Sequence, residues 1–256
     1  MPEGDTIHHA ANRIRPVLEG QVPDEIRTPH PRFGRDRWPE RLAGAAVRSV
    51  EARGKHLFIR FEGGMAIHSH LRMTGAWKVT ARGRPLPLRA WLVIERGDRA
   101  VVQVGGPVLE LMTEGRTRFD QVLAGLGEDV VARSGFDIDR YLGRLRADDP
   151  TRPIGDALLD QSVVAGLGTI WRSEACWHAQ LDPWRATGKV GDDEALAAVM
   201  LVRPLMQRSA AGGFKRELLR CYGHAGRPCP RCATPIERTS QGDNNRRLYW
   251  CPGCQR

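Results

Sequence analysis

The residues best suited to chemistry are four cysteines near the end of the sequence, in the pattern Cys229-x2-Cys232-x18-Cys251-x2-Cys254. Two thiolates separated by two residues can bind a metal from one tight turn, and two such turns complete a tetrahedral zinc site without an open position. The surrounding segment has too few apolar residues for a core of its own, so metal binding has to stabilise it. We predict one structural Zn²⁺ held by these four cysteines.

The other cysteines and the histidines are expected to be structural. Cys176 lies in an apolar helical pattern typical of a small buried thiol, and Cys221 is expected to be equally inert. His224 is close to the cysteine pairs, but four thiolates already satisfy zinc. Four other histidines have no third ligand at a spacing that suits a metal site; these are His8, His9, His68 and His70.

A junction between two predicted helices contains the sequence Ala165-Gly166-Leu167-Gly168-Thr169. Glycines in such a junction let a phosphate approach the unpaired N–H groups at a helix N-terminus. A plain helical hairpin needs glycine for its bend as well. From these residues alone, both interpretations stand.

The charge of the chain indicates a polyanionic partner. The net charge is +9, and the segment from Leu201 to Arg256 contains eleven Lys or Arg against three acidic residues. Arginine predominates, and its planar guanidinium suits phosphate and base-edge contacts. A membrane surface would require an amphipathic helix carrying the excess charge, and none is evident. Nucleic acid is therefore the favoured partner.

The length of 256 residues fits one large or two modest domains of an ordinary globular protein. No run of 18 apolar residues is present, and the start MPEGDT lacks the basic and apolar regions of a secretory signal. We expect a cytoplasmic protein that does not enter the membrane.

The hydrophobic pattern changes near the middle of the chain. Apolar spacing predicts a helix over residues 5–19, followed by β-rich segments that suggest a sandwich or barrel over residues 20–120. These segments cover residues 46–50, 56–61, 90–94 and 100–104. The stretch 123–135 is the best domain boundary, and after it the pattern predicts helices over residues 156–159, 170–179, 193–207 and 214–219.

Five motifs together resemble the formamidopyrimidine-DNA glycosylase and endonuclease VIII family over nearly the whole chain. They are, in order, Met1-Pro2-Glu3-Gly4, Arg53-Gly54-Lys55, the turn at residues 70–75, the glycine junction and the four-cysteine segment. The resemblance implies an α+β multidomain protein: an N-terminal β-sandwich with flanking helices (1–125), a helix-two-turn-helix domain (136–222) and a C-terminal four-cysteine zinc finger (223–256). It also implies a monomer that binds damaged double-stranded DNA.

The resemblance gives the first residues a catalytic role. Removal of Met1 would leave Pro2 with a secondary amine, and an α-amine with a pKa near 8 is partly neutral and nucleophilic at neutral pH. Its attack on the sugar C1′ would expel the base and form an iminium, which permits β- and then δ-elimination. Glu3 is placed to protonate the sugar ring oxygen or to carry the proton.

The resemblance also assigns DNA contacts. Lys55 and Arg246 bind the phosphates next to the lesion, although Arg247 replaces Arg246 if the match is displaced by one residue. Arg72 and Met73, together with Thr74, enter the base stack in place of the extruded base. Core packing is the competing interpretation of Met73. Further contacts are expected from Gly168 and Thr169 at the glycine junction.

Three departures from the family pattern bear on activity. Thr169 stands where the family usually has asparagine, and Thr6 stands near a usual glutamate. An Arg-Arg-Phe-Gly turn for the opposite strand has no match in Pro107–Phe119. The missing turn and the Pro-Glu-Gly start favour the endonuclease VIII branch.

These features predict a bifunctional DNA glycosylase and abasic-site lyase that removes oxidised bases, with pyrimidines favoured. The alternatives are an 8-oxoguanine-directed glycosylase of the same family and a non-catalytic, zinc-dependent DNA-binding protein.

Overall fold

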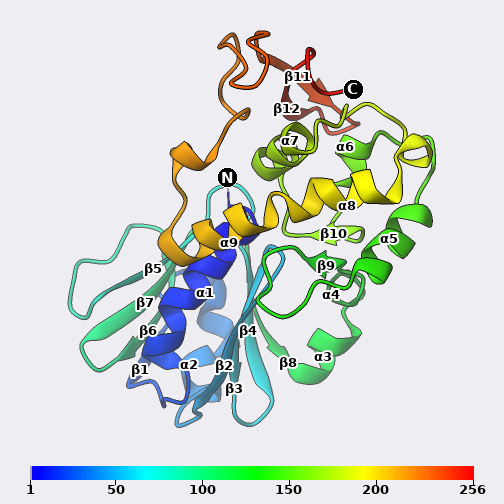
Figure 1. Ribbon diagram of the computed structural model, residues 1–256. Coiled ribbons are helices and arrows are strands. Elements are labelled where there is room, and N and C mark those ends of the chain that lie inside the picture. The colour runs from blue at the N-terminus through cyan, green and yellow to red at the C-terminus, as the bar shows by residue number, and fades with distance from the viewer. Residues whose placement is uncertain (1) are drawn as a thin grey trace. The chain divides into compact units, whose positions relative to one another are not determined.

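The computed structural model describes residues 2–256, with the side chains of residues 34 and 35 excepted. Contacts divide the chain into two compact units (Figure 1). The N-terminal unit is Pro2 together with Thr6–Ala124, and the C-terminal unit is Glu3–Asp5 together with Gly125–Arg256. Glu3 therefore packs with the C-terminal unit, although it follows Pro2 directly in the chain.

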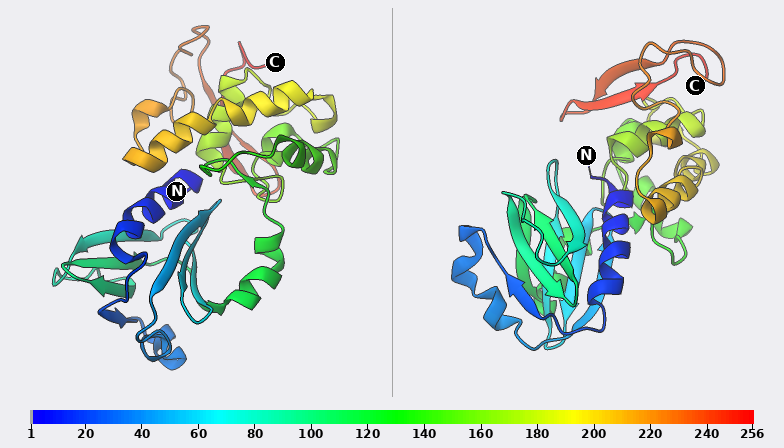
Figure 2. Two further views of the ribbon diagram at one scale, coloured as in Figure 1. Left: turned by 60° about the horizontal axis from the view of Figure 1, so that its bottom comes forward. Right: turned by 90° about the vertical axis from the view of Figure 1, so that its left-hand side faces the viewer.

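The N-terminal unit is built on two four-stranded antiparallel sheets, which Figure 2 shows face to face. One sheet has the order β1-β6-β7-β5, formed by Glu25–Arg27, Ala90–Arg96, Arg99–Val104 and Ala76–Ala81. The other has the order β2-β3-β4-β8, formed by Val47–Arg53, His56–Phe61, Met65–His70 and Val108–Thr113. Alternate residues of both sheets meet in one core, for example Ile59, Ile67, Ile94 and Val101. The predicted sandwich is confirmed.

Helices flank this sandwich. Helix α1 (Gly4–Leu18) repeats apolar residues at helical spacing, and Ile7, Ala11, Ile14 and Leu18 are fully buried in the sandwich core. Four shorter helical segments complete the N-terminal unit: the 3₁₀ helix η1 (Pro31–Asp36), α2 (Trp38–Arg41), α3 (Glu114–Phe119) and α4 (Gln121–Ala124).

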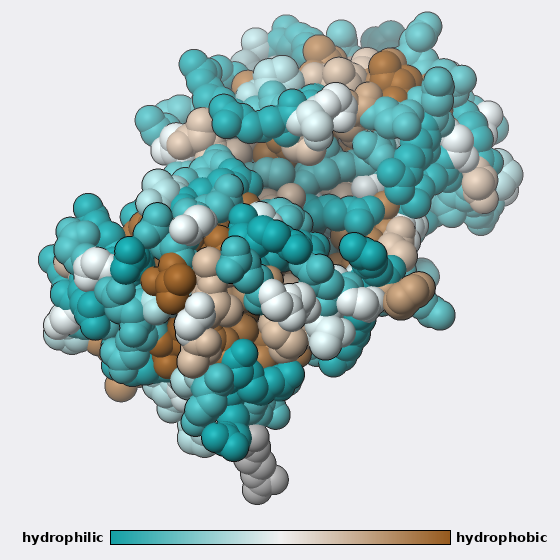
Figure 3. Space-filling view, turned by 90° about the horizontal axis from the view of Figure 1, so that it is seen from below, coloured by the Kyte–Doolittle hydropathy of each residue, from teal (hydrophilic) through white to brown (hydrophobic). Residues whose placement is uncertain are grey.

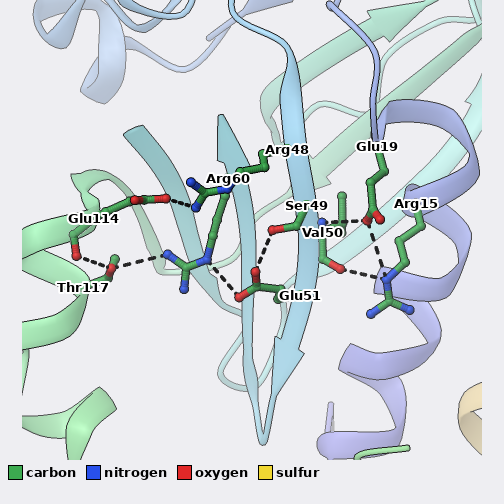
Figure 4. A network of polar contacts seen from close by, with 9 residues as sticks. All are labelled: Arg15, Glu19, Arg48, Ser49, Val50, Glu51, Arg60, Glu114 and Thr117. Carbon is green, nitrogen blue, oxygen red and sulfur yellow. Dashed lines mark hydrogen bonds and ion pairs between the residues drawn. The ribbon is translucent and has the colours of Figure 1, made fainter. Parts of the chain in front are cut away.

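A polar network joins α1 and α3 to β2 and β3 (Figure 4). Glu51 accepts hydrogen bonds from the Arg60 guanidinium at 2.9 Å and from the Ser49 hydroxyl at 2.6 Å. Arg60 also reaches the Thr117 hydroxyl of α3 at 3.4 Å, and Arg48 pairs with Glu114. On the α1 side, Arg15 and Glu19 bind the backbone C=O and N–H of Val50. The sheet β2-β3-β4-β8, which we call the second sheet, therefore has a strongly polar face opposite its core face.

Helices dominate the C-terminal unit. They are α5 (Ile138–Arg146), α6 (Ile154–Ala157), α7 (Thr169–His178), α8 (Asp192–Met200) and α9 (Arg203–Gly212), with 3₁₀ helices at Thr187–Lys189 and Arg216–Leu218. The short strands β9 (Glu128–Asp129) and β10 (Val164–Ala165) pair in parallel. An antiparallel hairpin, β11 (Glu237–Gln241) and β12 (Arg246–Trp250), precedes the end of the chain.

Two of the predicted helices need correction. The helix predicted over 193–207 is two helices, α8 and α9, because Pro204 in the first turn of α9 lacks an N–H and cannot continue α8. The helix predicted over 214–219 is only a 3₁₀ turn at Arg216–Leu218, which follows Gly213 with a positive φ of 85°. Helix α5 was not predicted at all.

Hydrophilic residues cover most of the face drawn in Figure 3, and hydrophobic residues occur there in small separate groups. Within residues 2–256, no helix combines the length and the apolar character needed to cross a bilayer.

Candidate active site

Helix α7 holds the carboxylate of Glu3 at its N-terminus. Glu3 accepts hydrogen bonds from the backbone N–H groups of Gly168 at 3.0 Å, Ile170 at 2.9 Å and Trp171 at 3.2 Å. The side chain is 1% exposed. Unpaired N–H groups and the positive end of the helix dipole both favour a carboxylate at this place. The orientation of Glu3 is therefore fixed by three donors.

The glycines of the junction make this approach possible. A Cβ on Gly168 would lie 2.4 Å from Cδ of Glu3, and one on Gly4 would lie 2.7 Å from Cα of Gly166. The Gly4 N–H donates to the Gly166 carbonyl at 2.9 Å. Glu3 and Gly4 thus occupy the N-terminus of α7, where phosphate binding was one of the two interpretations of the glycine junction. Gly168, predicted to contact DNA, directs its N–H to Glu3, and the adjacent Thr169 is buried.

A second buried carboxylate lies close to Glu3 in the chain. Asp5 is 1% exposed and accepts a hydrogen bond from the Ser209 hydroxyl of α9 at 2.5 Å. The family usually has its glutamate near the position of Thr6. In this chain a carboxylate is present one residue earlier.

The side of α7 holds the hairpin that carries Arg246. The fully buried Arg172 donates to Oε1 of Gln241 at 3.0 Å, to the Arg246 carbonyl at 3.2 Å and to the Arg247 carbonyl at 2.9 Å. The Tyr249 N–H adds a bond to Oγ of Ser173 at 3.2 Å. Figure 1 shows α7 beside β12. The role of Arg172 was not predicted; its signal in the sequence is an arginine among the apolar residues Ile170, Trp171 and Ala175 of the same helix.

Arg246 and Arg247 are both exposed, but consecutive strand residues point to opposite faces. Arg246 lines a cavity of about 640 Å³ together with Asp156, Asp160 and Asp243. The two candidates for the phosphate contact therefore serve different surfaces of the hairpin.

The four predicted metal ligands lie together. The Sγ atoms of Cys229, Cys232, Cys251 and Cys254 are all within 4.8 Å of one another. This spacing suits a tetrahedral ion with metal–sulfur bonds of about 2.3 Å. Burial opposes ionisation of Cys229, but N–H donors from Arg231 and the Trp177 indole outweigh it and lower the pKa of this thiol to about 6. Thiolates are the metal-binding form of cysteine.

The remaining two cysteines are both buried, as predicted for Cys176. Cys176 and Cys221 are fully buried, and burial raises the pKa of the Cys176 thiol to about 12 and that of Cys221 further. His224 is outside the thiol cluster, and its Nδ1 lies 3.1 Å from the Arg220 carbonyl.

The N-terminal unit contains Pro2, Lys55, Arg72 and Met73. Pro2 is half-buried and precedes α1. Lys55 lies in the two-residue turn between β2 and β3, which Gly54 makes possible with a φ of 56°. This turn places Lys55 at the end of the hairpin, as predicted.

The turn after β4 presents Met73 to solvent. The side chain is 60% exposed, so the core interpretation of Met73 is wrong. Arg72 has a positive φ of 51°, and its N–H donates to Nδ1 of His70 at 3.1 Å. Leu71, at the start of this turn, is buried. At its end, Gly75 packs closely on Gly106, because a Cβ on Gly75 would lie 2.7 Å from Cα of Gly106.

Residues 105–119 of the described chain contain no counterpart of the Arg-Arg-Phe-Gly turn. Strands β7 and β8 are joined by Gly105, Gly106 and Pro107 alone, and the residues after Pro107 form β8 and α3. The connection is too short to carry such a loop.

Two family models match the chain: the formamidopyrimidine-DNA glycosylase N-terminal domain over residues 1–121 and the H2TH domain of the same enzymes over residues 126–216. A probable endonuclease 8 2 of Streptomyces coelicolor is 37% identical over 273 residues, covering 100% of this chain and 94% of the relative. A DNA-(apurinic or apyrimidinic site) lyase of Mycolicibacterium smegmatis is 37% identical over 262 residues, covering 100% of this chain and 99% of the relative.

The same fold occurs in solved structures. The formamidopyrimidine-DNA glycosylase of Lactococcus lactis, bound to DNA that contains an abasic site, matches with a TM-score of 0.86 and 22% identity over 100% of both chains.

Proposed function

The chain belongs to the formamidopyrimidine-DNA glycosylase and endonuclease VIII family of base-excision-repair enzymes, and from this premise we propose how it acts. It is a DNA glycosylase and abasic-site lyase. We propose that it removes oxidised pyrimidines from double-stranded DNA as a cytoplasmic monomer. The missing opposite-strand turn and the similarity to endonuclease 8 relatives support the pyrimidine preference.

Pro2 is the proposed nucleophile. Met1 lies outside the described residues, and its removal exposes the secondary amine of Pro2. The nitrogen attacks C1′ as the bond from C1′ to the base breaks, and the base leaves with a proton. The bond from C1′ to the sugar ring oxygen then breaks as that oxygen takes a proton, and C1′ and the proline nitrogen are left joined as an iminium. The iminium carries a permanent positive charge and acidifies the C2′ proton. Loss of that proton expels the 3′ phosphate, and a second elimination expels the 5′ phosphate.

The observation that carries this proposal is the fixed carboxylate of Glu3, the residue that follows Pro2 in the chain. Three backbone donors at the start of α7 hold it, and the glycines at positions 4, 166 and 168 leave the space for it. A preorganised acid–base group beside a nucleophile is the arrangement that proton transfer requires. In this proposal Glu3 protonates the sugar ring oxygen.

The direct test is borohydride trapping on oligonucleotides that contain thymine glycol, dihydrouracil, 5-hydroxycytosine, 8-oxoguanine or an abasic site. We expect trapped adducts with the pyrimidine lesions and the abasic site. A preference for 8-oxoguanine would identify a purine-directed enzyme, and no adduct on any substrate would support the non-catalytic DNA-binding protein.

The four cysteines are proposed to hold one Zn²⁺ with a structural role. Four thiolates leave no position for substrate, so the ion would maintain the hairpin that carries Arg246. The indole N–H of Trp177 donates to Sγ of Cys229 at 3.4 Å, which would also tie the ion to α7.

Elemental analysis should find one zinc per chain, and Cys251→Ser should lose the metal and bind DNA at least tenfold more weakly. The matched control is Cys221→Ser, which changes a buried thiol outside the cluster and should retain zinc. Full DNA affinity and activity in a zinc-free protein would contradict the structural role.

Arg246 and Met73 are proposed to act differently on DNA. A phosphate contact contributes affinity without reading sequence, and each adds about 0.9 to the log–log salt slope. Arg246→Ala should weaken binding to lesion and undamaged duplexes by similar factors and flatten the slope by about one. Met73→Ala should weaken lesion binding more, because a wedge is needed only after a base leaves the stack.

Titrations of both duplexes at several salt concentrations measure these effects, with Arg247→Ala as the matched variant on the opposite face. A larger loss of slope for Arg247→Ala than for Arg246→Ala would move the phosphate contact by one residue. Equal effects of Met73→Ala on both duplexes would remove its wedge role.

A further inference from the structure

Three histidines lie together on the polar face of the second sheet, in the N-terminal unit. His56 of β3 pairs in register with His70 of β4, and His68 of β4 pairs with Glu110 of β8. Because side chains alternate along a strand, these four residues share one face. The rings of His56 and His68 are nearly parallel with centroids 5.2 Å apart, and His70 contacts His56 edge-on at 4.7 Å.

The polar atoms of this group follow one another in a line. Nδ1 of His56 lies 2.9 Å from Nε2 of His68, and both side chains are buried. The other nitrogen of His68, Nδ1, is buried without a hydrogen-bond partner among the described residues. The Oε2 atom of Glu110 lies 3.7 Å from it, a separation that a small movement or one bridging water closes. These contacts begin at the Glu110 carboxylate and end at His56, which follows Lys55 in the chain.

The protonation states fix the direction of these bonds. Burial lowers the pKa of His56 to about 3 and that of His70 to about 4, and it also lowers the pKa of His68. All three rings are therefore neutral near pH 7, and each carries a single N–H.

A carboxylate only accepts hydrogen bonds, so closing the 3.7 Å separation between Glu110 and His68 requires the N–H of His68 to be on Nδ1. Its Nε2 then accepts from Nδ1–H of His56, which leaves Nε2 of His56 without a proton. Independently, Nδ1 of His70 accepts from the Arg72 N–H at 3.1 Å, so the proton of His70 is on Nε2.

We propose that Glu110, His68 and His56 are positioning residues for Lys55 and His70. The carboxylate selects the tautomers of two buried imidazoles, and these hold the end of the β3–β4 pairing in one arrangement. Lys55 precedes His56 in the chain, and its charge lies close enough to His70 to depress the pKa of that imidazole. Glu110, His68 and His56 thus determine where the Lys55 ammonium and the Nε2–H of His70 lie. The consequence for catalysis rests on the proposed function, in which we assign to Lys55 a contact with the phosphate next to the lesion and assistance to its elimination.

The ring of Phe58 makes it possible to separate the effect of ring packing on His68 from the effect of its hydrogen bonds. Phe58 stacks on His68 with centroids 4.9 Å apart and makes no hydrogen bond. Phe58→Leu therefore loosens the packing around His68 but leaves the line of polar atoms intact. His68→Phe does the opposite, because it keeps a stacked ring and removes both nitrogens.

The first test is the tautomeric state of the full-length protein, read from long-range ¹H–¹⁵N NMR correlations of the imidazoles at pH 7. We expect a proton on Nδ1 of His56, on Nδ1 of His68 and on Nε2 of His70. A proton on Nε2 of His56 or of His68 would overturn the proposal, whatever the enzyme does.

The second test is cleavage of DNA that contains a preformed abasic site. His68→Phe should lower kcat about tenfold and leave KM within twofold, because the reacting groups are displaced rather than lost. Phe58→Leu should keep kcat within twofold. Equal losses in both variants would indicate packing alone and overturn the proposal. Absence of cleavage by the wild type would instead contradict the proposed function, and the tautomers would then decide the present inference.

Discussion

Replacement of Pro2 by glycine should abolish the borohydride-trapped adduct with abasic DNA while DNA binding remains within a few-fold of the wild type. The secondary amine of proline forms an iminium that is cationic at every pH, whereas the imine of a primary amine has to be protonated before it can draw electrons from C2′. The Lys55, Arg246 and Met73 side chains are unchanged in this variant, so affinity should persist.

A protein whose N-terminus is extended by a tag supplies a second variant with the same expectation, because Pro2 is then an internal amide without a nucleophilic lone pair. The matched control carries the same tag at the C-terminus and should form the adduct normally. An undiminished adduct in the N-terminally extended protein would exclude Pro2 as the nucleophile.

Glu3→Gln should bind damaged DNA yet excise the base about 10²–10⁴-fold more slowly, the range that a general acid or base contributes. The variant should also be less stable by about 1–3 kcal/mol, because the new NH₂ group has to face at least one backbone donor. In the wild type Oε1 accepts from Ile170, and Oε2 accepts from Gly168 and Trp171.

Glu174 is an unusually close control for this variant. It is a buried glutamate on the same helix, and it too accepts three backbone N–H bonds, from Arg220 at 2.9 Å, Cys221 at 2.9 Å and Tyr222 at 2.7 Å. Glu174→Gln should cost similar stability but leave single-turnover excision within a few-fold of the wild type. Equal excision by Glu3→Gln and the wild type would remove Glu3 from the mechanism.

The sequence predicted the features that depend on local spacing. The four cysteines, the sandwich and the helix after Gly168 each follow from short patterns, and the structure confirms them. Pairing across long distances was not accessible in the same way. The bond from Gly168 to Glu3 joins residues 165 positions apart, and no local pattern indicates it.

The errors have equally specific causes. The apolar spacing of residues 193–207 continues across the break between α8 and α9. Hydrophobic periodicity carries no information on the backbone N–H that Pro204 lacks. For Met73 only the competing core interpretation fails, because the turn that follows β4 directs its side chain to solvent. His68 was predicted to be structural, but its contacts with His56 and Glu110 were not predicted, because these partners come from two other strands.

The central claim is that the amine of Pro2 forms the covalent intermediate. The most direct measurement is mass spectrometry of the wild-type protein after borohydride trapping on abasic DNA and proteolysis. We predict that Met1 is absent and that the sugar remnant is attached to the peptide that begins with Pro2, at the α-nitrogen. Attachment at the side-chain nitrogen of Lys55 or of any other lysine would contradict the account.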